Sequence, residues 1–236
     1  MLHERLNAYE CPRRTPAPPA AQIVASIVCV GCALCCIGNY MTCTLYGFET
    51  DTIGFLRIGA CLLVLPASMT LICLNHVEYR AFERVRHDPR TQIIDNLRII
   101  GVLSASTAVG GVALFAFVAA TRIGLPQGYE VVVLLAAVQM TFMMNVAVAL
   151  LNMLLSSCGL PWIYGTAILV AFFVLVERML EPMAGNITRY LCFFWYPISF
   201  DWGAIFFQQT LPFIGYCIVM ILVITMVFEH REQLGA

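Results

Sequence analysis

Side chains that could act as acids, bases or metal ligands lie mostly outside the apolar stretches of this chain. The four histidines are confined to the N-terminal leader, to the polar segment His76–Arg98 and to the C-terminal tail. No two of them are spaced as a pair of metal ligands on one helix. The sequence also lacks a Gly-x-Ser-x-Gly nucleophile motif and a pair of carboxylates within one apolar stretch. It therefore predicts no metal centre. An intramembrane enzyme remains an alternative function, with Glu78, Glu83 and His87 as its candidate cluster.

The eleven cysteines are the other reactive side chains. Cys29, Cys32, Cys35 and Cys36 cluster in the first apolar stretch, and three of them share one face of a helix. Thiolate clusters bind soft metals, so a metal or haem cargo is one interpretation. Within an apolar helix, however, cysteine behaves as a small buried hydrophobic residue. Packing is therefore the favoured interpretation of this cluster.

If this chain is part of a transporter, its sequence contains no recognisable energy source of its own. Proton-coupled transporters usually carry an acid or a base in the middle of a membrane span, whereas the mid-span polar residues here are neutral, such as Asn145 and Asn152. The chain contains no lysine, so it cannot form the Gly-x4-Gly-Lys-Ser/Thr loop that cradles nucleotide phosphates. If ATP supplies the energy, a separate subunit must bind it. That subunit would need a docking surface on this chain.

Composition identifies the elements that must position these residues. The chain is 61% hydrophobic and 11% charged, and its mean hydropathy is +0.84, which is typical of membrane proteins. A bilayer core of roughly 30 Å requires about 20 apolar residues in a helix. Six stretches reach or approach that length, which predicts an all-α polytopic membrane protein with six transmembrane helices behind a cytoplasmic leader, residues 1–21. The six stretches are Gln22–Leu45, Ile53–Leu74, Ile99–Ala120, Val131–Leu155, Leu160–Val176 and Leu211–Phe228.

The distribution of arginine predicts the orientation. With both termini in the cytoplasm, nine arginines lie on the inner side and four on the outer side, as the positive-inside rule requires. We therefore expect a multi-pass protein of the cytoplasmic membrane.

The segment Met183–Thr210 needs a separate interpretation because it is apolar and very aromatic but is interrupted by Arg189, Pro197 and Asp201. Tryptophan and tyrosine concentrate at membrane interfaces. We expect one or two short re-entrant helices on the outer side, with a turn near Pro197–Asp201. If the segment instead crossed the bilayer, the protein would have seven spans.

The polar segment His76–Arg98 has the pattern of a docking element. Tyr79, Phe82 and Val85 recur at a spacing of three and form a short apolar stripe on a helix. Asp88 followed by Pro89 is typical of a helix cap and the first helical residue, so a second helix is expected to begin near Arg90 and to run into the third span. The alternative is an ordinary basic loop that holds the topology against anionic lipid.

The order of leader, two spans, Glu- and Arg-rich helix, proline and further spans resembles the permease subunits of ABC-2 type ABC transporters. The residues that carry the resemblance are Glu78 to Arg90, notably Glu83, Pro89, Arg90 and Thr91. The family usually has an apolar residue and then Ser/Thr-Arg/Lys after the proline, whereas this chain has Arg90 and Thr91. The resemblance covers nearly the whole chain as an architecture, but its motif is short.

The resemblance implies a function and its partners. A coupling helix within residues 76–98 would dock on a separate ABC ATPase that holds ATP and Mg, and a second permease chain, identical or related, would complete the transporter. The implied cargo is amphipathic or hydrophobic: an antimicrobial peptide, a drug, a lipid or a glycolipid. No cofactor in this chain and no nucleic-acid partner are expected. A non-transporting assembly factor or sensor remains an alternative.

The resemblance also implies two sets of site residues. The docking residues would be Tyr79, Phe82, Glu83, Val85, Arg86, Pro89 and Arg90. The candidate residues of the substrate path are Asn39, Tyr40, Thr44, Ser68, Thr166, Phe193, Trp195 and Tyr196.

Overall fold

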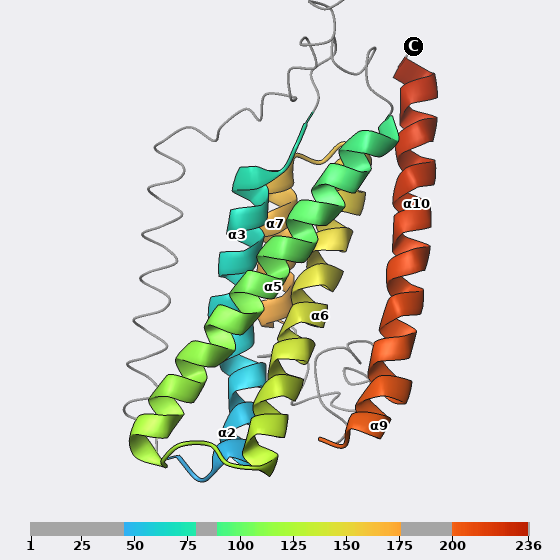
Figure 1. Ribbon diagram of the computed structural model, residues 1–236. Coiled ribbons are helices and arrows are strands. Elements are labelled where there is room, and N and C mark those ends of the chain that lie inside the picture. The colour runs from blue at the N-terminus through green and yellow to red at the C-terminus, as the bar shows by residue number, and fades with distance from the viewer. Residues whose placement is uncertain (1–44, 79–88, 176–199, 236) are drawn as a thin grey trace, which may run out of the picture.

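The computed structural model describes residues 45–78, 89–175 and 200–235, and within these ranges the chain forms helices and no strand. The helices stand side by side and run up and down through a single bundle (Figure 1). In chain order the elements are α2 (Phe48–Gly54), η1 (Phe55–Val64), α3 (Leu65–Asn75), α5 (Pro89–Arg122), α6 (Tyr129–Ser157), α7 (Trp162–Leu175), α9 (Trp202–Ile205), η3 (Phe206–Thr210) and α10 (Leu211–Gly235).

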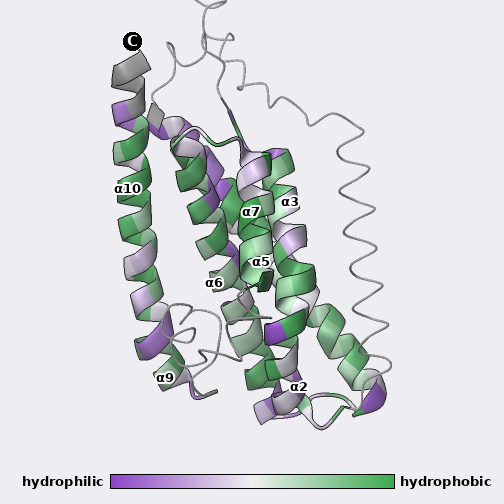
Figure 2. Ribbon diagram, turned by 180° about the vertical axis from the view of Figure 1, so that it is seen from behind, coloured by the Kyte–Doolittle hydropathy of each residue, from purple (hydrophilic) through white to green (hydrophobic). Residues whose placement is uncertain are grey.

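Four helical runs are long and apolar enough to cross a membrane: Phe48–Asn75, Arg90–Arg122, Tyr129–Ser157 and Trp202–His230. Their middle turns are mostly apolar, and hydrophilic residues gather toward the ends of the helices (Figure 2). These runs confirm the predicted class of all-α membrane protein. The predicted first span, Gln22–Leu45, lies almost wholly outside the described residues, and the fifth is represented by the 14 residues of α7.

Helix α6 is the centre of the bundle. It packs against α5, α7 and α10 and also contacts the α2–α3 run. Most of its buried side chains are small or flexible and apolar, among them Ala136, Met140, Met144 and Ala147. Because small residues let helix backbones approach closely, this composition allows α6 to contact several neighbours at once.

The turn from α6 into α7 depends on Gly159, which adopts a φ of 104°. That conformation strains any residue with a Cβ atom. The amide of Gly159 donates to the carbonyl of Ser156, and the amide of Leu160 donates to that of Leu155. These two bonds satisfy carbonyls at the end of α6 and reverse the chain, so that α7 packs back on α6.

Two helices begin earlier than the sequence predicts. The second span starts at Phe48 rather than Ile53, because the buried carboxylate of Asp51 accepts hydrogen bonds from the amides of Tyr46 and Gly47 at 3.0 Å each. The last helical run starts at Trp202, where Asp201 is the N-cap and accepts a bond from the Ala204 amide. Residues 202–210, which the sequence assigned to the re-entrant segment, therefore belong to the last helical run.

Helix α5 confirms the predicted start of a helix after Asp88, since its first residue is Pro89. Its 34 residues span about 51 Å, which exceeds a hydrocarbon core of roughly 30 Å. The first turns of α5 lie at the same end of the bundle as the C-terminus (Figure 1).

Candidate functional site

The two flanks of the predicted docking element meet at one end of the bundle. Residues 76–78 leave α3 there, α5 begins there at Pro89, and α7 begins and α10 ends nearby (Figure 1). We call this group of chain ends the polar junction. Interactions of its side chains define its geometry, and each joins elements that are distant in the sequence or closes a helix end.

Asn96 of α5 holds the chain where it leaves α3. Its Oδ1 accepts a hydrogen bond from the Val77 amide at 2.8 Å, and its Nδ2 donates to the Val77 carbonyl at 3.0 Å. Asn96 and Val77 are 4% and 5% exposed. Both backbone groups of a buried residue are thus satisfied by one amide side chain, which substitutes for the helix bonds that end at His76.

His76 closes the end of α3 and contacts α7. Its Nδ1 lies 2.6 Å from the Cys73 carbonyl, and its ring stacks on Trp162 with centroids 5.0 Å apart. Trp162 opens α7 and is buried. Its carbonyl accepts a bond from Asn152 of α6, so His76, Trp162 and Asn152 tie α3, α7 and α6 together.

Arg90 ties the start of α5 to the end of α10. Its Nε and Nη2 atoms each lie 3.3 Å from Oε1 of Glu229. Both side chains are exposed, so solvent screens their attraction. The pair therefore positions two chain ends relative to each other and adds little to the stability of the bundle.

The predicted docking residues fall mostly outside the described residues. This holds for Tyr79, Phe82, Glu83, Val85 and Arg86. The structure places the remaining two at the start of α5.

Pro89 is the first residue of α5, and Arg90 is the exposed partner of Glu229. The alternative cluster for an enzyme is described only at Glu78, whose carboxylate lies 3.9 Å from Nε2 of His76.

The structure describes two of the predicted substrate-path residues, Ser68 and Thr166. Ser68 is fully buried inside the bundle. Thr166 accepts a bond at 2.9 Å from Nδ2 of Asn152, which links α7 to α6. Both residues therefore face helix contacts of this chain. The other predicted path residues lie outside the described part of the chain: Asn39, Tyr40, Thr44, Phe193, Trp195 and Tyr196.

The cysteine cluster Cys29, Cys32, Cys35 and Cys36 also lies outside the described residues. Among the residues that the structure does describe, no group of three or more His, Cys, Asp or Glu side chains could hold a metal ion.

Sequence reasoning missed the roles of several buried polar residues. Asn145 on α6 donates to Thr107 on α5 at 3.2 Å in the middle of both helices. Asn96, Asn145 and Asn152 are all 4% exposed or less. A polar side chain inside an otherwise apolar run is the signal that marks Asn145 and Asn152, because such a group needs a partner on a neighbouring helix.

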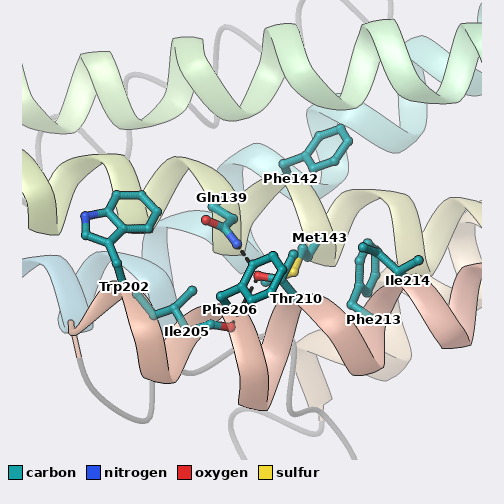
Figure 3. A pocket seen from close by; sticks show the side chains of 9 residues that line it. All are labelled: Gln139, Phe142, Met143, Trp202, Ile205, Phe206, Thr210, Phe213 and Ile214. Carbon is teal, nitrogen blue, oxygen red and sulfur yellow. Dashed lines mark hydrogen bonds between the residues drawn. The ribbon is translucent and has the colours of Figure 1, made fainter.

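A second feature of the structure is a cavity of about 430 Å³ between α6 and the α9–η3–α10 run (Figure 3). Gln139 of α6 donates a hydrogen bond to Thr210 in its wall. The rest of the lining is apolar and rich in aromatic rings. Among the described residues, the cavity is lined by Gln139, Phe142, Met143, Trp202, Ile205, Phe206, Thr210, Phe213 and Ile214.

Comparison of the chain with protein-family models, with curated proteins and with solved structures found no match.

Proposed function

We propose that this chain is the membrane-spanning subunit of an ATP-driven exporter that resembles the ABC-2 type. In this proposal it moves an amphipathic or hydrophobic molecule across the cytoplasmic membrane. A separate ABC ATPase binds and hydrolyses ATP with Mg, and a second permease chain completes the transport pathway. The chain has no enzymatic activity of its own.

The observation that carries the proposal is the anchoring of the predicted docking element at both flanks. Within the segment His76–Arg98, Asn96 fixes the chain at Val77 and Glu229 pairs with Arg90, so residues 79–88 are anchored on both sides. An ATPase that pulled on the element would therefore move α5 directly. It would also move the end of α10 through Arg90.

The anchoring also explains how a short element could transmit force through the bilayer. Helix α5 is continuous from Pro89 to Arg122 and packs along α6 and α3. A displacement at its first turn is carried to the opposite membrane face because a continuous helix tilts as a rigid rod. A flexible loop anchored at one flank only would absorb the same displacement.

A block substitution tests the proposal. The chain is co-expressed with a candidate ABC ATPase from the same genome, and residues 82–86 are replaced by alanine. We expect the ATPase to co-purify with the parent chain and to be lost from the variant, while the helical content of the chain is unchanged. The matched control replaces residues 123–127, an exposed loop at the opposite end of the bundle, and should keep the ATPase bound.

Two outcomes would contradict the proposal. If the parent chain forms no stable complex with any such ATPase, an assembly factor or sensor becomes the better interpretation. If the block variant keeps the ATPase but loses a chemical activity, the enzyme alternative with Glu78, Glu83 and His87 replaces it.

A further inference from the structure

A small cavity lies within the polar junction, where α5, α6, α7 and α10 all contribute to its lining. Its volume is about 20 Å³. A cavity needs about 10–15 Å³ to hold one water molecule, so this one has room for about one water and for no organic ligand. Among the described residues, the lining consists of Gln92, Ile93, Asn96, Met153, Ser156, Ser157, Trp162 and Phe228.

Gln92 of α5 brings a buried acceptor to this cavity. Its side chain is 8% exposed. Its Oε1 atom is buried and has no hydrogen-bond partner among the residues that the structure describes. A buried acceptor without a partner is costly, and where no protein donor is near, an ordered water usually supplies the bond. Gln92 therefore marks the cavity as a site for a hydrogen-bond donor.

Two further polar side chains of the lining suit a water molecule. Asn96 lies one turn from Gln92 on α5, so both side chains lie on the same face of the helix. Only one hydrogen of its Nδ2 is used by the Val77 carbonyl, and an amide nitrogen carries two. On α6, the hydroxyl of Ser157 donates to the Met153 carbonyl at 2.9 Å, and its oxygen has lone pairs that accept. A buried water typically makes two to four bonds of this kind.

The composition of the lining favours water over a cation of similar size. No aspartate or glutamate is among the described residues that line the cavity. A cation placed there would lose its hydration shell without a carboxylate to compensate its charge, which is costly. A neutral molecule that both donates and accepts has no such penalty.

We propose that this cavity binds one structural water molecule, which donates a hydrogen bond to Oε1 of Gln92 and also bonds to Asn96 and Ser157. The water joins the first turns of α5 to the end of α6. It lies within one helical turn of the bonds by which Asn96 holds Val77. The inference rests on the cavity and on the buried polar groups and is independent of the proposed export function.

X-ray footprinting of the full chain in lipid nanodiscs tests the water directly. A short X-ray pulse splits water into hydroxyl radicals, which modify reactive side chains beside the place where they form. Met153 and Trp162 line the cavity and are buried, so we expect mass spectrometry to find both modified. Met140 and Met144 are buried on the same helix as Met153 but lie outside the lining, and they should stay unmodified. Equal modification of Met153 and Met140 would overturn the site.

A substitution that fills the cavity separates bound water from radicals that arrive from bulk solvent. Ser157→Val adds a methyl group to the wall and should expel the water, so the modification of Met153 and Trp162 should fall to the level of Met140. The matched control is Thr141→Val, a buried change of similar chemistry elsewhere on α6, where the hydroxyl bonds to Ala137. It should leave the pattern unchanged. Undiminished modification in Ser157→Val would mean that the radicals come from outside, and the proposal would fail.

Gln92→Met gives a second test, because methionine has a similar length but no amide. If a water satisfies Gln92, the variant loses a hydrogen bond, and the midpoint of thermal unfolding should fall. In the Ser157→Val background the water is already expelled and the acceptor is without a partner. The same change should there raise the midpoint. A rise in the parent chain would show that Oε1 has no water and would overturn the proposal. No ATPase takes part in these measurements, so their result and that of the exporter test are separate.

Discussion

Asn96 binds both the amide and the carbonyl of Val77, at 2.8 and 3.0 Å, across a gap of 19 residues in the sequence. One side chain on α5 therefore fixes the course of the chain as it leaves α3. Both partners are buried, so water does not replace these bonds when they are lost.

Asn96→Ala should lower the free energy of unfolding by about 1–3 kcal/mol, because it leaves two buried backbone groups without partners. Thermal unfolding of the purified protein measures the loss. The matched control is Asn75→Ala at the same end of the bundle, where the side chain bonds to Leu71 of its own helix. If Asn75→Ala lowered the free energy of unfolding as much as Asn96→Ala does, the bonds between Asn96 and Val77 would not be the cause of the loss.

Arg90 and Glu229 allow the ion pair to be separated from ATPase docking. Arg90→Glu should abolish co-purification of the ATPase, whereas Glu229→Arg should retain it, because Arg90 belongs to the proposed docking surface. The exposed pair should change the free energy of unfolding by less than about 1 kcal/mol in either variant. The double variant that exchanges the two charges decides the role of the pair. We expect it still to lack the ATPase; recovery of the complex would mean that Arg90 acts through Glu229.

Gly111 lies where α5 packs closely on the second span. A Cβ atom at this position would collide with Cγ2 of Val64, whereas a Cβ atom at Gly110 would meet nothing nearby. Gly111→Ala should therefore destabilise the bundle by about 1–3 kcal/mol through overpacking, and Gly110→Ala should not. Thermal unfolding again provides the measurement. Adding Val64→Ala to Gly111→Ala should recover part of the loss, and failure to recover any would exclude this contact as the cause.

Cys158 reports on the orientation in the membrane because it is exposed in the turn after α6, at the end of the polar junction. In a variant that keeps only this cysteine, a membrane-impermeant maleimide should label inverted vesicles but not intact cells. The control carries its single cysteine at Gln127, in the loop at the opposite end, and should show the reverse pattern. Labelling of Cys158 from outside intact cells would reverse the predicted topology.

Much of the fold can be predicted from the sequence because helix formation is local. Long apolar runs predict membrane-spanning helices wherever the backbone must satisfy its own hydrogen bonds. Pro89 predicts the start of α5 because proline lacks the amide that a first helical residue does not need. The helix that contains the predicted span Ile53–Leu74 begins earlier, at Phe48, where Asp51 bonds to the amides of Tyr46 and Gly47. In the structure Asp51 is buried and caps the helix that contains it.

The contacts that form the candidate sites join residues far apart in the sequence, so they could not be predicted in this way. The sequence by itself determined that this is an all-α membrane protein, that its charge gathers in the polar segment His76–Arg98 and that α5 begins after Asp88. Only the tertiary structure decided that Asn96 holds Val77 and that Arg90 meets Glu229, 139 residues away. It also decided that Gln139 and Thr210 bond to each other in the wall of a cavity. The physical reason is that a helix forms from contacts within one turn, whereas the register between two helices depends on how their side chains interlock.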